Sequence, residues 1–193
     1  MKKFELTAEF VTNVFGKKLF RIKALVAFGN VEKGELGGFI EKEDNLSHDG
    51  DAWVYGNAQV SGDARVYGNA QVFGNARVSG NAQVFGNARV SGNARVYGNA
   101  QVYGNAWVYG NAQVSDDADY AVVKGFGRCF RTTTFFRCKD KILRVQCGCF
   151  YGDLAQFREI VKKTHGDSKY AKEYLAIADL MELHFSDECG GEQ

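Results

Sequence analysis

The chain has 193 residues, of which 45% are apolar and 24% are charged, and it contains 23 glycines but no proline. This balance is sufficient for a packed core and excludes a disordered polar tail. The formal net charge of +1 excludes binding of polyanions through overall charge, and equally excludes an acidic mimic of nucleic acid. Because proline is absent, the turns have to be made by Gly and by the Asn residues that cluster in the middle of the chain.

The sequence carries no signal for a membrane span or for secretion. No apolar run approaches the length of about 18 residues that a membrane helix needs, and Glu5 and Glu9 interrupt the region where a signal peptide is apolar. The five cysteines are an odd number, which fits reduced thiols better than a disulfide framework. We therefore expect a cytoplasmic protein with no membrane partner.

Residues 1–49 are expected to form an N-terminal cap and lead-in. Over residues 4–28, two apolar stretches flank Asn13 and Gly16, which predicts a β-hairpin. Residues 30–49 contain three glycines and a charged run. We expect them to form a loop that leads into a first, incomplete coil.

Residues 50–115 consist of eleven unbroken hexads of the type GNAQVF, and a decayed twelfth follows at Asp116. Each hexad holds an invariant Val, and the invariant Ala of the next hexad comes four residues later. A period of six fits neither an amphipathic helix nor a simple alternating strand. It suits a triangular parallel β-coil of three hexads, with Val inside, Ala near the corner, and Gly with Asn or Asp forming the turn. The region 50–121 therefore predicts a single-stranded β-solenoid of about 3.7 coils.

The spacing V-x-G-N-A-x resembles that of the hexapeptide-repeat family of left-handed β-helices. The lead-in, with Leu36-Gly-Gly-Phe-Ile and Asn45-Leu-Ser-His-Asp-Gly, is also similar to GNA-repeat proteins of bacteria and phages that have no settled activity. The first resemblance implies a mainly β, left-handed triangular solenoid that assembles as a homotrimer, and acyl transfer or carbonic-anhydrase-like chemistry in some members.

Residues 122–193 are expected to form a small α+β unit. Two or three strands are predicted over 122–150, and two helices follow them. The first helix is expected to begin at Asp153, an N-cap with Gln156 three residues later, and to end at Gly166.

Two features of the repeat surface are candidate binding sites. Residues 18 apart lie above one another if three hexads make a coil, so the position after each Val forms one column per face. One column is wholly aromatic and consists of Tyr67, Phe85 and Tyr103. Such a strip is covered by homotrimerisation or by the C-terminal helices, or it binds a ligand whose ring stacks on it. At the position after Ala, Arg77 lies above Arg95, and an anion or an acidic partner would relieve this like-charge pair.

The densest positive charge follows the repeat, where cations alternate with phenylalanines over 124–144. Arg128, Arg131 and Arg137 are therefore candidates for binding an anion such as a nucleotide. The same alternation is also typical of the solvated face of a strand layer.

The sequence offers no catalytic constellation. No His occurs between 49 and 164, so His48 is the nearest candidate base for acyl transfer. Four cysteines lack the paired spacing of structural zinc sites and are expected to be mostly buried thiols: Cys129, Cys138, Cys147 and Cys149. We expect no catalytic residue, no metal site and no cofactor.

The favoured function is a non-enzymatic binding or sequestering module. The resemblance to phage-encoded GNA-repeat proteins implies a phage or prophage accessory protein that acts on a host protein, such as a defence protein, or on a nucleotide. A homotrimeric hexapeptide-type acyltransferase and a passive structural solenoid are the alternatives.

Overall fold

The computed structural model describes residues 1–186 and divides into two compact units, Met1–Asp117 and Ala118–Gln193. The first holds the solenoid and its N-terminal cap, and the second holds an antiparallel sheet with two helices. The prediction of a parallel β-solenoid preceded by a hairpin and followed by an α+β unit is confirmed.

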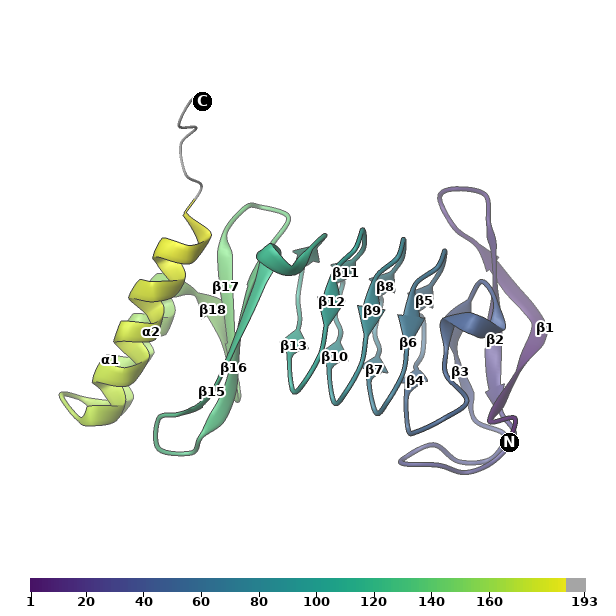
Figure 1. Cartoon of the computed structure of the whole chain (residues 1–193), viewed down its shortest axis with the longest axis horizontal. Helices are drawn as coiled ribbons and strands as arrows, with labels where there is room; N and C mark the ends of the chain where they lie inside the picture. The colour runs from purple at the N-terminus through teal and green to yellow at the C-terminus, as the bar shows by residue number, and fades with distance from the viewer. Residues whose placement is uncertain (187–193) are drawn as a thin grey trace. The chain divides into compact units, whose positions relative to one another are not determined.

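The solenoid is built from strands of two residues, each formed by the residue after Ala and the Val that follows it (Figure 1). They are β4 (Trp53–Val54), β5 (Gln59–Val60), β6 (Arg65–Val66), β7 (Gln71–Val72), β8 (Arg77–Val78), β9 (Gln83–Val84), β10 (Arg89–Val90), β11 (Arg95–Val96), β12 (Gln101–Val102), β13 (Trp107–Val108) and β14 (Gln113–Val114). Every third strand pairs in parallel, which gives three faces with the orders β4-β7-β10-β13, β5-β8-β11-β14 and β6-β9-β12. The repeated Val and Ala side chains are 0–1% exposed, so they form the interior as the hexad pattern predicts.

The corners depend on glycine. The repeat glycines from Gly50 to Gly110 have φ between 58° and 70°, a region that L side chains rarely adopt. A Cβ added at Gly68 would also lie 3.0 Å from the backbone nitrogen of Gly86 in the next coil. At the same corners Asn side chains bond to one another from coil to coil, as Asn69 does to Asn87 at 3.2 Å. Gly and Asn therefore shape the turns, as predicted in the absence of proline.

The N-terminal cap joins the solenoid through a strand that we expected to be loop. The hairpin of β1 (Phe4–Thr12) and β2 (Lys18–Ala24) agrees with the prediction. The next strand, β3 (Leu36–Ile40), pairs antiparallel with β2 and parallel with β5, so the loop prediction for 30–49 is wrong over these residues. Gly37 and Gly38 are needed here because an added Cβ would lie 2.6 Å and 2.5 Å from backbone carbonyl oxygens of the first coil.

Residues before the repeat also bind the open edge of the first coil. The Asn45 side chain, at the end of the short helix η1 (Glu43–Asn45), donates to the carbonyls of Gly62 and Ala64 at 3.0 and 2.8 Å. Backbone N–H groups of the lead-in donate in the same way, since Phe39 bonds to the Ala58 carbonyl at 2.9 Å. These contacts pair groups that an uncapped solenoid end would leave open.

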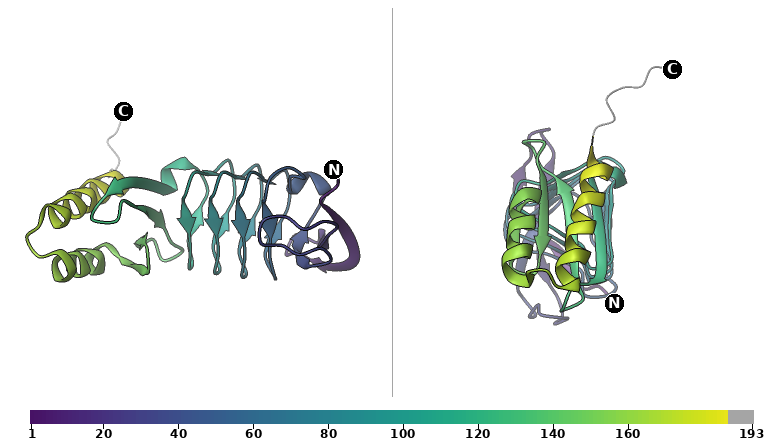
Figure 2. Two further views of the ribbon diagram at one scale, coloured as in Figure 1. Left: turned by 90° about the horizontal axis from the view of Figure 1, so that it is seen from below. Right: turned by 90° about the vertical axis from the view of Figure 1, so that its left-hand side faces the viewer.

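The second unit is a four-stranded antiparallel sheet with two helices packed together (Figure 2). The second short helix of the chain, η2 (Asp117–Asp119), comes just before its first strand. The strands are β15 (Tyr120–Phe126), β16 (Arg131–Arg137), β17 (Leu143–Cys147) and β18 (Phe150–Asp153), four where two or three were predicted. The extra strand, β18, follows a tight turn at Gly148 and ends at the first helix.

Both predicted helices are present. The first, α1 (Leu154–His165), begins with a capping box between Asp153 and Gln156 and ends at Gly166, as predicted. The second, α2 (Lys169–Phe185), has Ser168 as its N-cap. The core of this unit lies between the helices and one face of the sheet and includes Phe135, Val145, Phe157, Ile177 and Met181.

Candidate functional site

The aromatic column, which we define as Tyr67, Phe85 and Tyr103, runs along one face of the solenoid. The rings of Tyr67 and Phe85 stack with centroids 4.9 Å apart and planes 2° from parallel. Those of Phe85 and Tyr103 stack at 5.3 Å and 16°. This is the spacing of adjacent strands, so each coil adds one ring to the column. Tyr103 is 53% exposed, and the column therefore presents apolar surface outside the core.

A pocket of about 750 Å³ lies beside Tyr67, at the end of the column nearer the N-terminus. Its lining comes from the lead-in and from two coils, and consists of Glu43, Asp44, Leu46, Ser47, His48, Arg65, Val66, Tyr67 and Gln83. The pocket combines an aromatic ring with carboxylates, a guanidinium, an amide and a hydroxyl. It can therefore bind a ligand that has both a planar apolar part and polar groups.

His48 is held in place by hydrogen bonds to both ring nitrogens. Nδ1 accepts the backbone N–H of Lys3 at 3.1 Å, which leaves the ring proton on Nε2 to be donated to a Glu43 oxygen at 2.7 Å. The imidazole also stacks on Phe4 with centroids 4.3 Å apart. The hydrogen bond from His48, together with one from Lys2, keeps the pKa of Glu43 below its usual value. A general base needs a nitrogen that can accept a proton from the substrate, and both nitrogens of His48 are engaged in holding the cap.

Arg77 and Arg95 are direct neighbours on adjacent coils, as predicted. Their Cα atoms are partners in the parallel pairing of β8 and β11, and both side chains are exposed. They lie on a different face from the aromatic column, whose strands are β6, β9 and β12. The five solenoid residues predicted to bind a ligand therefore form two separate groups.

The three arginines predicted to bind an anion in the second unit also separate. Arg128 and Arg131 line a pocket of about 350 Å³ with an apolar floor that includes Phe157 and Val161. Arg137 lies elsewhere, because its Nη2 donates to the Phe185 carbonyl at 3.0 Å, at the end of α2. The geometry gives Arg137 a role in holding α2 to the sheet.

Four cysteines of the second unit are free thiols: Cys129, Cys138, Cys147 and Cys149. Cys129, Cys147 and Cys149 line the same pocket as Arg128 and Arg131. Of these four thiols only Cys138 is buried, so the prediction that they are mostly buried is wrong. Burial raises the pKa of the Cys138 thiol, and burial together with the nearby Cys147 raises the pKa of Tyr174 to about 12. Among residues 1–186, no group of three or more His, Cys, Asp or Glu side chains is placed to hold a metal ion. Cys189 lies outside the described residues.

The stacked coils of short parallel strands define the chain as a β-solenoid repeat protein of about four turns. Its repeats match the YdcK beta solenoid repeat family over residues 58–70, 70–86, 82–98, 88–101 and 100–116, together less than a third of the chain. A search of the curated proteins finds no match to the chain. None of the helices within residues 1–186 is both long enough and apolar enough to cross a membrane.

Sequence reasoning found the aromatic column but missed the pocket at its end. The missing information was how the lead-in pairs with the repeat. Leu46 pairs with Val66, 20 residues later, whereas equivalent residues of adjacent coils within the repeat are 18 residues apart. The apolar pair Ile40 and Leu46, six residues apart like the Val positions, is the signal that could have revealed this earlier coil.

Proposed function

We propose that the protein is a non-enzymatic binding module whose solenoid presents the aromatic column to a ligand. The observation that carries the proposal is the column itself, three stacked rings that end in a pocket of about 750 Å³. Aromatic platforms of this kind bind planar rings, because every ring offers a π-face for stacking.

The size of the column favours a small ligand over a subunit interface. Tyr67 and Phe85 are half-buried already, and Tyr103 is 53% exposed. Since aromatic side chains have roughly 200 Å² each and only Tyr103 is half exposed, the column offers less than about 300 Å² in total. A stable interface needs about 800 Å² from each partner. A homotrimer, which the hexapeptide-repeat resemblance implies, would therefore need another surface as well.

The bonding of His48 favours binding over acyl transfer. In the acyltransferase alternative His48 is the nearest base to the coils, and its two nitrogens are bonded to Lys3 and Glu43. Activating an acceptor hydroxyl would require breaking one of these bonds. The resemblance to phage-encoded GNA-repeat proteins supports a role as a phage or prophage accessory protein that sequesters a host component.

The test is equilibrium binding by titration calorimetry with four classes of probe: ribonucleotides, nucleosides, oligosaccharides and peptides rich in aromatic residues. We expect at least one class to bind the wild type and to lose affinity in the variant Tyr67→Ser/Phe85→Ser/Tyr103→Ser. Ser79→Ala, on another face, is the control. Absence of binding by all four classes, or binding that the triple variant retains, would refute the proposal.

A further inference from the structure

The aromatic column is interrupted at its N-terminal end by a small residue. The N–H of Ser47 donates to the Val66 carbonyl at 2.9 Å, just as the N–H of Tyr67 donates to the Val84 carbonyl at 3.0 Å. Leu46 and Val66 also form a parallel bridge. Ser47 therefore occupies the backbone position that precedes Tyr67 in the column. The three coils that follow it carry an aromatic residue at this position, namely Tyr67, Phe85 and Tyr103.

The side chain of Ser47 cannot cover the ring of Tyr67. Its hydroxyl accepts the backbone N–H of Asp49 at 3.0 Å, which holds it within its own turn. One face of the Tyr67 ring is covered by Phe85, at 4.9 Å. The other face is directed toward the coil of Ser47, where the pocket of about 750 Å³ lies. The pocket thus begins where one aromatic ring is missing from the stack.

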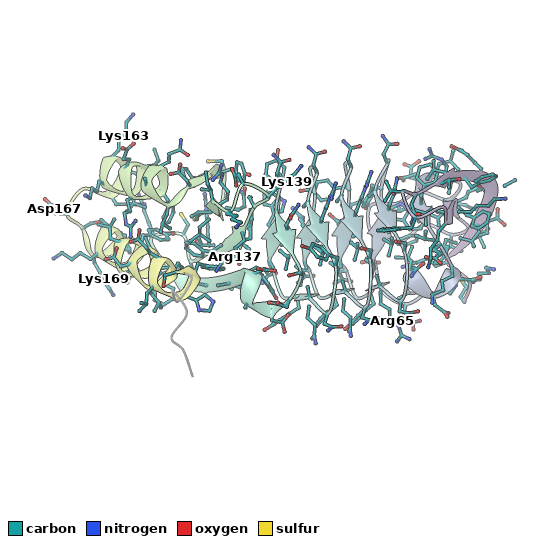
Figure 3. The ribbon with its side chains drawn as sticks, turned by 90° about the horizontal axis from the view of Figure 1, so that it is seen from above. Arg65, Arg137, Lys139, Lys163, Asp167 and Lys169 are labelled. Atoms are coloured by element: carbon teal, nitrogen blue, oxygen red, sulfur yellow. The ribbon has the colours of Figure 1, made fainter. Side chains whose placement is uncertain are left out.

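Polar groups surround this open position. The hydroxyl of Tyr67 donates to the Gln83 Oε1 atom at 2.9 Å, so the NH₂ group of Gln83 is left to donate to a ligand. Arg65 is exposed and extends outward from the coil (Figure 3), and the carboxylate on which it acts electrostatically, Asp63, is ion-paired with Lys42 at 2.6 Å. On the lead-in side the pocket is lined by the carboxylates of Glu43 and Asp44, and Glu43 is hydrogen-bonded to Lys2 and His48. A ring in this position therefore has hydrogen-bond donors, acceptors and a cation around it.

We propose that a nucleotide binds here, with its base stacked on Tyr67 in the column position that Ser47 leaves open and its phosphate paired with Arg65. The base continues the stack of Tyr67, Phe85 and Tyr103 as a fourth ring. The amide of Gln83 and the carboxylate of Asp44 meet the polar edge of the base or the ribose hydroxyls. This inference rests on the proposed function and specifies its site and ligand class.

The test places an aromatic side chain of the protein itself in the open position, by the substitution Ser47→Phe. Binding of AMP, GMP, CMP, UMP and their 3′,5′-cyclic forms is measured by titration calorimetry on the full chain. We expect at least one of them to bind the wild type and Ser47→Phe to weaken its binding about tenfold or more, because the new ring takes the place of the base. Ser61→Phe is the matched control, since Ser61 has the same backbone bonding, to the Val78 carbonyl, on another face.

Two further variants make the result independent of how Ser47→Phe folds. Tyr67→Leu removes the stacking surface without adding bulk and is expected to cause a similar loss of affinity. Arg65→Gln is expected to weaken the nucleotide while leaving the corresponding nucleoside unchanged, because only the phosphate needs the guanidinium.

The outcomes separate this inference from the proposed function. Failure of every nucleotide to bind the wild type, or binding that Ser47→Phe and Tyr67→Leu both retain, refutes the site. Binding of oligosaccharides or aromatic peptides that depends on the column would still support the binding module in that case.

Discussion

Lys3 donates from Nζ to the carbonyl oxygen of Ala52 at 2.9 Å, and in doing so ties the start of the chain to the first coil of the solenoid. The same ammonium donates to the Gly50 carbonyl at 3.1 Å and lies 4.6 Å from the centre of the Phe28 ring. Lys3 is only 3% exposed. Lys3 thus donates to two carbonyls at the open edge of the solenoid, where no earlier coil is present to pair with them. Asn45 does the same at another corner of the solenoid.

Replacing Lys3 by Met is expected to lower the free energy of unfolding by about 1–3 kcal/mol, because buried carbonyls lose their donor. Urea denaturation followed by circular dichroism measures the change. Lys2→Met is the matched control, since Lys2 pairs with Glu43 at 3.2 Å on the exposed surface, and the loss of this pair should change stability by less than about 1 kcal/mol. Equal effects of the two variants would show that Lys3 does not hold the edge.

The burial of Lys3 also predicts a dependence of stability on pH. Desolvation lowers the pKa of Lys3 to about 8 from 10.5, although Asp51 and Asp49 oppose the shift. Between these two values the unfolded chain binds more protons at Lys3 than the folded chain, so the contribution of Lys3 to stability increases as the pH rises. The difference in Tm between wild type and Lys3→Met should therefore widen from about pH 8 to about pH 10. A difference that stays constant or narrows would contradict the burial of a titrating Lys3.

Replacing His48 by Ala is expected to lower the stability of the fold and to leave acyl transfer unaffected. The variant loses the hydrogen bonds to Lys3 and Glu43 and the stack on Phe4, a loss of about 1–3 kcal/mol. Release of free coenzyme A from acetyl-CoA, followed by chromatography, should not exceed the rate without protein for either the wild type or the variant. Turnover by the wild type that disappears in His48→Ala would favour the acyltransferase alternative.

The solenoid could be predicted from the sequence because its period appears in every hexad. Val and Ala recur at fixed positions, and a coil that fails to bury them has no other core, so the three faces and their register follow directly. The lead-in lacks such redundancy. Gly37 and Gly38 suggested a loop, although their role is to let a strand approach the backbone of Val54 and Ala58 closely. A single pair of glycines in a sequence does not show whether the glycines make a loop flexible or allow a strand to approach another backbone closely.

The candidate site was predictable only in part for the same reason. Tyr67, Phe85 and Tyr103 share the period of the repeat, and their stacking follows from it. The open face of Tyr67 depends on Ser47, which reaches its position through a coil that is two residues longer than the others. The arginines of the second unit share no period, and their separation into a pocket pair and a helix-binding Arg137 depends on side-chain packing.

Replacing Arg95 by Gln is expected to stabilise the protein, because it removes one member of a like-charge pair on adjacent coils. Arg77 and Arg95 are Cα partners, and such pairs cost about 0.2–1 kcal/mol. The gain in Tm should be present at about 0.01 M salt and vanish near 1 M, where charges are screened within a few ångströms. Arg89→Gln is the control, since Arg89 is paired with Gln71 and Trp107. A gain that persists at high salt would mean that repulsion is not its cause.

Removing the aromatic column is expected to leave the molecular mass in solution unchanged. The column offers less than about 300 Å² of exposed surface, well below the roughly 800 Å² per partner of a stable interface. Light scattering should therefore give the same mass for the wild type and for Tyr67→Ser/Phe85→Ser/Tyr103→Ser, with circular dichroism confirming that the variant retains its strands. Val and Ala, which form the interior, are untouched by these substitutions, so the coils should still fold. A trimeric wild type that becomes monomeric in the variant would make the column an assembly interface, and any ligand site would then lie between subunits.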